Sequence, residues 1–428
     1  MLGSVAELGA RGVVFATMFA TIAIVSRSLS PEAFGVWSVL SALAFFGTSF
    51  DFGLGQAMRN RLTALTATQP RDRDLERRLF FSIWHALTFV AIVLIGILLL
   101  TSDMIPWVAL LDAQDSTIAS EIPFVAGTVA CLFLSSMIFS LAGAGFYAYQ
   151  ESGIRSLFDV LQSLLLLATV LVFANRLQLS GLVAAYYGAL NIGLAIMFFA
   201  FLQRRNWTFQ WIRTRVWLEH VRDLVPSSLA FWLLGVSALM ILSTDPIIAA
   251  RTLGLAEAGV FSVTQKLFTI VITIHFAFLT PLWAGYAHAI ASQDWGWIRQ
   301  AFKRSLAITL GLAVLGSSTL ALAAPTLLHV LLGREVHNWA LIASLMAWVS
   351  MYAVINCYSV LLNGLGRVWV QTFFSVFGAL VNWPLSLWLG GLMGAPGIVL
   401  GSIGSLLPAL LSNVVQVHLL LKRSHEVR

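Results

Sequence analysis

Seven ionisable side chains lie within long apolar stretches of this chain, and an eighth, His288, lies near the end of one. The seven are Arg11, Asp51, His85, Asp159, Asp245, Lys266 and His275. An ionisable group inside a membrane is costly, so such residues usually face the interior of a helix bundle and mark a path for ions or substrates. Such side chains can bind an anion through a positive charge, or can take up and release a proton.

Lys266 is one of only three lysines, and it lies about ten residues into its apolar stretch. In a helix this depth is roughly 15 Å, near the middle of the membrane. Two interpretations remain open. Lys266 either forms a buried pair with Asp245 that holds two helices together, or faces an anionic substrate. His275 is nine residues further along, about 180° around the helix, so it cannot share a surface with Lys266.

Asp51 lies late in the second apolar stretch and precedes Gly53 and Gly55, which loosen a helix and let another backbone approach. It either pairs with Arg59 or Arg61 to fix the end of the helix, or acts as a hinge or protonatable coupling site. We leave both interpretations open.

Two further ionisable residues follow a residue of opposite charge at a spacing of four, as in ordinary pairs on a helix surface. Asp159 follows Arg155 at this spacing, and we favour a local pair there. Arg11 follows Glu7, and a local pair and a cationic site remain equally open for it.

Residues 25–39 (VSRSLSPEAFGVWSV) and 249–263 (AARTLGLAEAGVFSV) are similar without a gap, at a spacing close to half of the 428 residues. This similarity predicts two copies of one unit. Arg27 and Arg251 occupy equivalent outer ends of helices. There they either bond the last carbonyls of each helix, which we favour, or form a cationic rim.

The composition places the chain in the membrane. It is 59% hydrophobic and 10% charged, whereas soluble proteins carry about 25% charged residues. Runs of about 20 apolar residues can cross the hydrocarbon core as helices. Twelve such runs occur, at about 9–29, 33–58, 79–101, 122–147, 156–175, 181–203, 224–250, 257–290, 305–332, 340–363, 370–391 and 398–421. We predict an all-α polytopic membrane protein whose twelve transmembrane helices form two parallel six-helix lobes around a central cavity.

The basic residues predict the orientation of the chain. Of the 25 lysines and arginines, one lies in a span, Lys266, and four lie in connections on one side: Arg27, Arg176, Arg251 and Arg334. The remaining twenty lie in the termini and in the connections of the other side. We predict that this richer side, and both termini, are cytoplasmic.

We place the N-terminal lobe at 1–203, a cytoplasmic linker at 204–223 and the C-terminal lobe at 224–428. The linker is rich in arginine, and its apolar residues are spaced to share one helix face: Trp207, Trp211, Leu218 and Val221. This pattern is typical of an amphipathic helix that lies on an anionic membrane surface.

Two motifs resemble those of a known family. Leu29, Pro31, Phe34 and Gly35 match a "lg-P-x-x-F/Y-G" connection after the first helix, and Asp51, Gly53 and Leu54 match a later "D-x-G-L" segment. The chain thus resembles bacterial polysaccharide flippases of the Wzx type. Residues 253–267 resemble the connection between helices 7 and 8 of that family. These flippases share a superfamily with the multidrug and toxin extruders.

The resemblance implies a transporter of the cell inner membrane that works by alternating access. Its substrate would be an undecaprenyl-pyrophosphate-linked oligosaccharide, flipped to the outer leaflet for lipopolysaccharide or exopolysaccharide biosynthesis. The implied partners are this lipid-linked oligosaccharide, membrane lipids, a polysaccharide polymerase and a chain-length regulator, and we expect a monomer. The alternative is a cation-coupled multidrug extruder, against which the net charge of +6 argues.

Under the flippase interpretation, each ionisable candidate has an expected role. Substrate binding is expected of Lys266, Arg11, Arg27 and Arg251, and coupling or gating of Asp51, Asp245 and His275. The sequence has neither G-x-x-x-x-G-K-[ST] nor H-E-x-x-H. We therefore expect no enzymatic activity, no cofactor and no metal site. Energy would come from an H⁺ or Na⁺ gradient, or from consumption of the product outside. A membrane protein with this charge bias needs no nucleic-acid partner.

Overall fold

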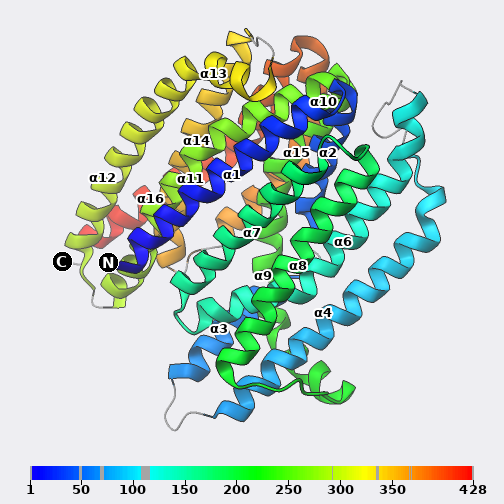
Figure 1. Cartoon of the computed structure of the whole chain (residues 1–428). Helices are drawn as coiled ribbons and strands as arrows, with labels where there is room; N and C mark the ends of the chain where they lie inside the picture. The colour runs from blue at the N-terminus through cyan, green and yellow to red at the C-terminus, as the bar shows by residue number, and fades with distance from the viewer. Residues whose placement is uncertain are drawn as a thin grey trace. The chain divides into compact units, whose positions relative to one another are not determined.

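The computed structural model describes residues 2–47, 51–67, 72–107, 116–291, 293–333, 337–365, 367 and 369–426. Within these ranges every regular element is a helix (Figure 1). Eleven helical stretches there are long and apolar enough to cross a membrane. The prediction of an all-α polytopic membrane protein is thereby confirmed. The span predicted at 33–58 contains α2 (Pro31–Gly47), which has 17 residues, and the start of α3 (Leu54–Ala67).

The chain forms two compact units, Met1–Val236 and Ser237–Arg428. Their boundary lies within α9 (Thr214–Ser243), later in the sequence than the linker predicted at 204–223.

In the first unit, α6 packs against α4 and α8, while α7 packs against α1 and α8. Phe80, Phe146 and Phe201 are fully buried where α4, α6 and α8 meet. Besides α2 and α3, the elements are α1 (Leu2–Ser28), α4 (Arg73–Thr101), the 3₁₀ turn η2 (Ser102–Met104), α6 (Ser116–Ala148), α7 (Ser152–Phe173) and α8 (Leu179–Arg205).

The single amphipathic helix predicted within 204–223 is wrong. The helix α8 ends at Arg205 because Asn206 adopts a left-handed conformation with φ 54°, a common way for a helix to stop. Residues 207–213 are not helical, and α9 begins at Thr214. Trp207 packs on Phe80 of α4, with ring centroids 5.5 Å apart, whereas Trp211 is 79% exposed. The burial of one aromatic ring thus separates side chains that were expected to share a face.

In the second unit, α16 packs against α14 and α15, and α11 packs against α14. The elements are α10 (Asp245–Leu253), α11 (Leu255–Ala291), α12 (Trp295–Gly311), the π turn η3 (Leu312–Gly316), α13 (Ser317–Leu332), α14 (Trp339–Gly364), α15 (Trp369–Met393) and α16 (Ala395–Glu426). Helices α12 and α13 continue one another through η3 as one apolar stretch from Trp295 to Leu332.

A close approach between α15 and α16 positions the polar residues of this unit. A Cβ atom on Gly401 of α16 would lie 2.4 Å from the Cα of Ser386 on α15, nearer than any real side chain permits. Glycine at 401 therefore lets the two backbones touch. The contact brings polar side chains of both helices toward α10.

Candidate functional site

The sequence interrupts one apolar span at Thr244, between α9 and α10. Pro246 lies at the start of α10, where its missing N–H costs no helical hydrogen bond. Asp245 is in the same first turn, where a helix dipole favours a negative charge. Its side chain is only 1% exposed. The break therefore presents a carboxylate inside the second unit.

The Asp245 carboxylate is surrounded by polar side chains from other helices. Ser402 Oγ of α16 lies 2.9 Å from both carboxylate oxygens. Gln265 Nε2 of α11 lies 3.4 Å from Oδ2. Asn382 of α15 donates from Nδ2 to Thr244 Oγ1 at 3.0 Å, which connects α15 to the break itself. Three helices thus converge on the start of α10.

Among the described residues, the hydroxyl that approaches the Asp245 carboxylate is that of Ser402. Ser402 Oγ is close to both Asp245 oxygens and 3.0 Å from Asn382 Oδ1, yet a hydroxyl has one proton to donate. Ser386 and Ser405 hydroxyls also approach Asn382 Oδ1, at 3.1 and 3.3 Å. Ser402 can therefore donate a hydrogen bond to only one of the two Asp245 oxygens at a time.

A buried carboxylate with so few donors needs another source of positive charge. No basic side chain in the described part of the chain forms an ion pair with Asp245. An isolated charge in such surroundings is too costly to persist, so the group must take up a proton or lie beside a cation. Carboxylate, amide and hydroxyl oxygens are the ligands that hard cations prefer. The arrangement suits a proton or a hard cation.

Lys266 lies beside this cluster in sequence but not in contact. Gln265 contacts Asp245, and the next residue of a helix points about 100° away. The structure describes both Lys266 and Asp245 and forms no ion pair between them. The interpretation of Lys266 as the structural partner of Asp245 is therefore wrong. Lys266 is half-buried, about 16 Å along α11 from Leu255.

His275 is fully buried and joins two helices of the second unit. Its Nε2 lies 2.8 Å from Thr309 Oγ1 of α12. Its Nδ1 is buried without a hydrogen-bond partner among the described residues. This geometry connects α11 to α12, and the expected coupling role of His275 stays a prediction.

Asp51 caps a helix in the first unit. Its Oδ1 accepts the Gly53 N–H at 2.8 Å, and Oδ2 accepts the Gly55 N–H at 3.3 Å, at the start of α3. Gly53 has φ 72°. A Cβ atom there would lie 2.4 Å from the Ser228 carbonyl oxygen of α9. The D-x-G-L motif thus shapes a bent junction whose backbone touches α9, as a hinge would require.

The three arginine candidates lie on α1 and α10. Arg27 and Arg251 are exposed in the last turns of α1 and α10, where a positive charge complements the helix dipole. Arg11 is half-buried on α1. The side chain of Glu7, its expected alternative partner, lies outside the described residues.

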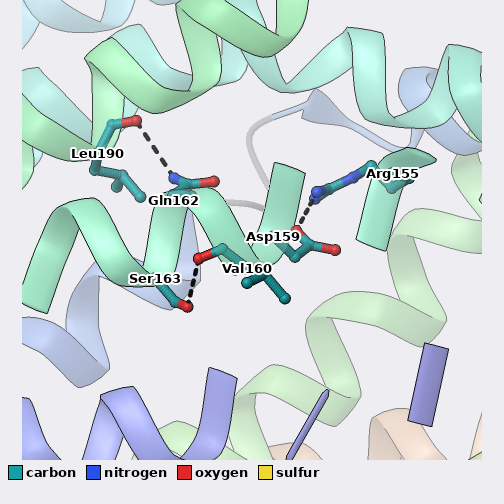
Figure 2. Close-up of polar contacts among 6 residues, drawn as sticks. All are labelled: Arg155, Asp159, Val160, Gln162, Ser163 and Leu190. Carbon is teal, nitrogen blue, oxygen red and sulfur yellow. Dashed lines mark hydrogen bonds and ion pairs between the residues drawn. The ribbon is translucent and has the colours of Figure 1, made fainter. Parts of the chain in front are cut away.

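The local pair favoured for Asp159 is confirmed. Figure 2 shows Arg155 and Asp159 joined as an ion pair one turn apart on α7. Nearby, Gln162 Nε2 donates to the Leu190 carbonyl oxygen of α8 at 3.3 Å (Figure 2). These contacts fix α7 to itself and to α8, which is a structural role.

The sequence interpretation missed the uncharged members of the Asp245 cluster, namely Gln265, Asn382, Ser386, Ser402 and Ser405. Only Asn382 and Gln265 carried a signal, because an amide inside an apolar span must find partners. The serines could not be distinguished from the many small residues that let membrane helices pack.

No family model matches the chain. Curated relatives nevertheless cover most of it. The "Putative O-antigen export protein" of Yersinia pseudotuberculosis is 21% identical over 411 residues, which is 93% of this chain and 91% of that protein. The "Putative O-antigen transporter" of Salmonella typhimurium is 22% identical over 413 residues, 91% of this chain and 90% of its own.

Solved transporter structures share the fold. An inward-facing multidrug resistance MATE family transporter of the MOP superfamily matches with a TM-score of 0.79 and 14% identity, over 98% of this chain and 99% of its own. The lipid II flippase MurJ, in an inward closed conformation, matches with a TM-score of 0.73 and 10% identity, over 97% and 87%. The resemblance seen in the sequence is confirmed: the chain is a multi-pass membrane protein with the fold of the MOP superfamily of transporters, similar along most of its length to proteins named as O-antigen transporters.

Proposed function

We propose that this protein flips an undecaprenyl-pyrophosphate-linked oligosaccharide from the cytoplasmic to the outer leaflet of the inner membrane, for synthesis of a cell-surface polysaccharide such as O-antigen. The observation that carries the proposal is the similarity over 93% of the chain to a protein named for O-antigen export. The fold supports it, because a lipid II flippase has the same fold.

In this proposal both termini are cytoplasmic, as the distribution of basic residues predicts. Lys266 and Arg11 bind the pyrophosphate-sugar within the membrane, and Arg27 and Arg251 bind it near the outer ends of α1 and α10. Phosphate groups favour such cationic partners.

Asp245 is the proposed coupling residue. Uptake of H⁺ or Na⁺ at its carboxylate, with Asn382 and Ser402 as neighbouring oxygen donors, would neutralise the buried charge. Loss of the ion would leave an uncompensated charge between α10, α15 and α16. That penalty gives the ion gradient a means to shift the conformation of this unit. Asp51, before the start of α3, and His275, where α11 contacts α12, are proposed as gating residues.

The second candidate is a cation-coupled multidrug extruder, and the MATE structure with a TM-score of 0.79 favours it. The two candidates predict opposite substrates, since one binds a polyanionic lipid and the other binds organic cations.

The test is a deletion strain with complementation. Loss of the gene should cause undecaprenyl-linked repeat units to accumulate on the cytoplasmic face and the surface polysaccharide to disappear. Lys266→Ala should fail to restore it. The matched control is Lys303→Ala, which removes the same charge from an exposed position on α12. Full rescue by Lys266→Met would show that the charge at 266 is dispensable.

The same strain separates the two candidates. If the deletion leaves the polysaccharide intact but raises sensitivity to cationic drugs, the extruder function is favoured over the flippase function.

A further inference from the structure

A cavity of about 280 Å³ lies between α11 and α12 in the second unit, and none of its walls belongs to the Asp245 cluster. Phe278 of α11 and Trp297 and Ile308 of α12 form much of the lining. These side chains are 38%, 39% and 48% exposed. The cavity is therefore open to the surroundings of the helices, and large apolar groups border the opening.

The inner wall of the cavity is held by specific contacts. Trp297 packs edge-on against Tyr286 of α11, with ring centroids 5.8 Å apart. A Cβ atom on Gly285 would lie 2.8 Å from the Trp297 ring, so glycine makes room for the indole. Ser305 Oγ lies 3.4 Å from both Tyr286 Oη and Cys357 Sγ. The cavity is thus a shaped recess with a fixed floor.

The cavity lining is mostly apolar, and its polar residues Gln300 and Arg304 lie toward one end. Gln300, Arg304 and Ile308 all line it at successive turns of one face of α12. Gln300 and Arg304 lie toward the start of the helix, and Ile308 lies deeper, with Phe278 among the other apolar lining residues. The recess is amphipathic along the helix axis.

The depth of Arg304 corresponds to the lipid headgroups. The apolar stretch from Trp295 to Leu332 has 38 residues, which span about 57 Å as a helix. The hydrocarbon core is about 30 Å thick, or about 20 residues. If its outer edge is near Leu332, its inner edge is near residue 312. Ile308 then lies about 6 Å and Arg304 about 12 Å beyond this inner edge. The long side chain of Arg304 can reach back to the headgroup layer.

Within the described residues, no carboxylate neutralises the charge at the polar end. The Arg304 side chain is exposed, and no carboxylate of the described residues pairs with it. Guanidinium groups bind phosphate through paired hydrogen bonds. Basic pockets between transmembrane helices on the cytoplasmic side are known to bind anionic lipid headgroups.

We propose that this cavity is a binding site for an anionic phospholipid of the leaflet that surrounds the start of α12. The phosphate lies against Arg304 and Gln300, and the glycerol backbone and the start of one acyl chain lie along Ile308 and Phe278. The volume is slightly below the roughly 300–1,000 Å³ of drug-sized ligand pockets, so it holds part of one chain and excludes an oligosaccharide. The site is independent of the transported substrate.

The experiment uses the purified full-length protein in detergent and counts bound lipid by native mass spectrometry. Phosphatidylglycerol, phosphatidylcholine and undecaprenyl phosphate are added separately at equal concentration. Arg304→Gln should reduce bound phosphatidylglycerol about tenfold, the loss expected when a charge-assisted hydrogen bond is removed. Lys303→Gln is the matched control, because it removes the same charge at the next, exposed residue, which does not line the cavity. It should change binding less than about twofold.

A second variant tests the acyl slot without a change of charge. Ala301→Trp fills the lined space and should also reduce phosphatidylglycerol binding about tenfold, and it serves alone if Arg304→Gln does not fold. Equal losses for Lys303→Gln and Arg304→Gln would overturn the proposal, since binding would then follow general charge. The proposal would also be overturned if the wild-type protein retained phosphatidylcholine as well as phosphatidylglycerol. Stronger retention of undecaprenyl phosphate than of phosphatidylglycerol would overturn it as well, because the cavity would then be a substrate site.

Discussion

In the first copy of the repeat, α1 runs unbroken to Ser28, and after the turn a junction at Asp51 precedes the separate helix α3. In the second copy the helix before the turn breaks at Thr244, and α11 after the turn runs unbroken from Leu255 to Ala291. The turns themselves correspond, because α2 starts at Pro31 and α11 at Leu255, the same offset that relates the two sequences. The duplication therefore preserved the turn and changed the helices on either side of it.

Each break carries an aspartate, but the two differ in what surrounds them. Among the described residues, Asp51 bonds nearby backbone N–H groups of its own junction. Asp245 contacts side chains from α11 and α16. The position in the first copy that corresponds to Asp245 is Thr21, and the one that corresponds to Lys266 is Ala42, both buried. A local cap stabilises a bend. A carboxylate shared between helices changes its interactions with all of them when it ionises.

The largest expected effect is that of Asp245→Asn. This change keeps the size of the side chain but removes the charge that would bind the coupling ion, so transport should fall to the level of cells without the protein. Asp51→Asn should keep transport within about twofold of the wild type, because Asn and Asp cap helices about equally well. Restoration of surface polysaccharide in the deletion strain, corrected for the amount of protein, measures both.

Two results would contradict this difference. Normal transport by Asp245→Asn would make its cluster structural. Loss of transport in Asp51→Asn with unchanged protein amount would assign the coupling role to the first break.

The next effect concerns Gly53, at the first break, and Gly254, in the turn between α10 and α11. Gly53 and Gly254 both have positive φ, at 72° and 87°. A Cβ atom on Gly53 would meet the Ser228 backbone, whereas one on Gly254 would meet nothing within 4 Å. Gly53→Ala should cost about 3 kcal/mol, from strain plus overlap, and Gly254→Ala about 1–2 kcal/mol from strain alone. Melting temperatures in detergent measure the difference, and equal losses would show that α9 moves away freely.

The sequence predicted the parts of this comparison that depend on regular patterns. Long apolar runs gave the helices, and residues 25–39 and 249–263 located the two turns. The breaks were harder to place, because Thr244 lies inside an apolar run whose only interruption signal is Pro246. The helix predicted within the linker was wrong because periodicity cannot foresee that Trp207 packs on Phe80.

The candidate site was predictable only in its charged member. Asp245 stands out because an acid inside a span is rare. Its neighbours Asn382 and Ser402 come from helices more than 130 residues away, and their contact depends on the glycine that lets α15 and α16 touch. Nothing in a single sequence specifies such pairings, so the sequence left open whether Lys266 pairs with Asp245.

A smaller effect is expected from the cap at the first break. Asp51→Ala removes both hydrogen bonds to the start of α3 and should lower stability by about 1 kcal/mol. Asp51→Asn should leave the melting temperature nearly unchanged and serves as the control. If Asp51→Ala is as stable as the wild type, the cap does not hold the bend.

The smallest effect tests how α9, which leads to the second break, is attached to the first unit. His220 Nδ1 lies 2.8 Å from Ser82 Oγ of α4. Burial lowers the pKa of His220 below its usual value near 6.5; Asp223 and Glu219 oppose this shift, and Arg78 adds to it.

The folded protein thus favours the neutral imidazole of His220, while the unfolded chain binds a proton there more readily. The stability from this group is complete above pH 6.5 and is lost as the pH falls through the lowered pKa. Between pH 7.5 and 5.5 the melting temperature of the wild type should fall more than that of His220→Asn. The extra fall should be smaller than the fall in melting temperature caused by Asp51→Ala. Parallel decreases in the two proteins would assign the pH dependence to other groups and leave Gly53 as the tested contact of α9 with the first break.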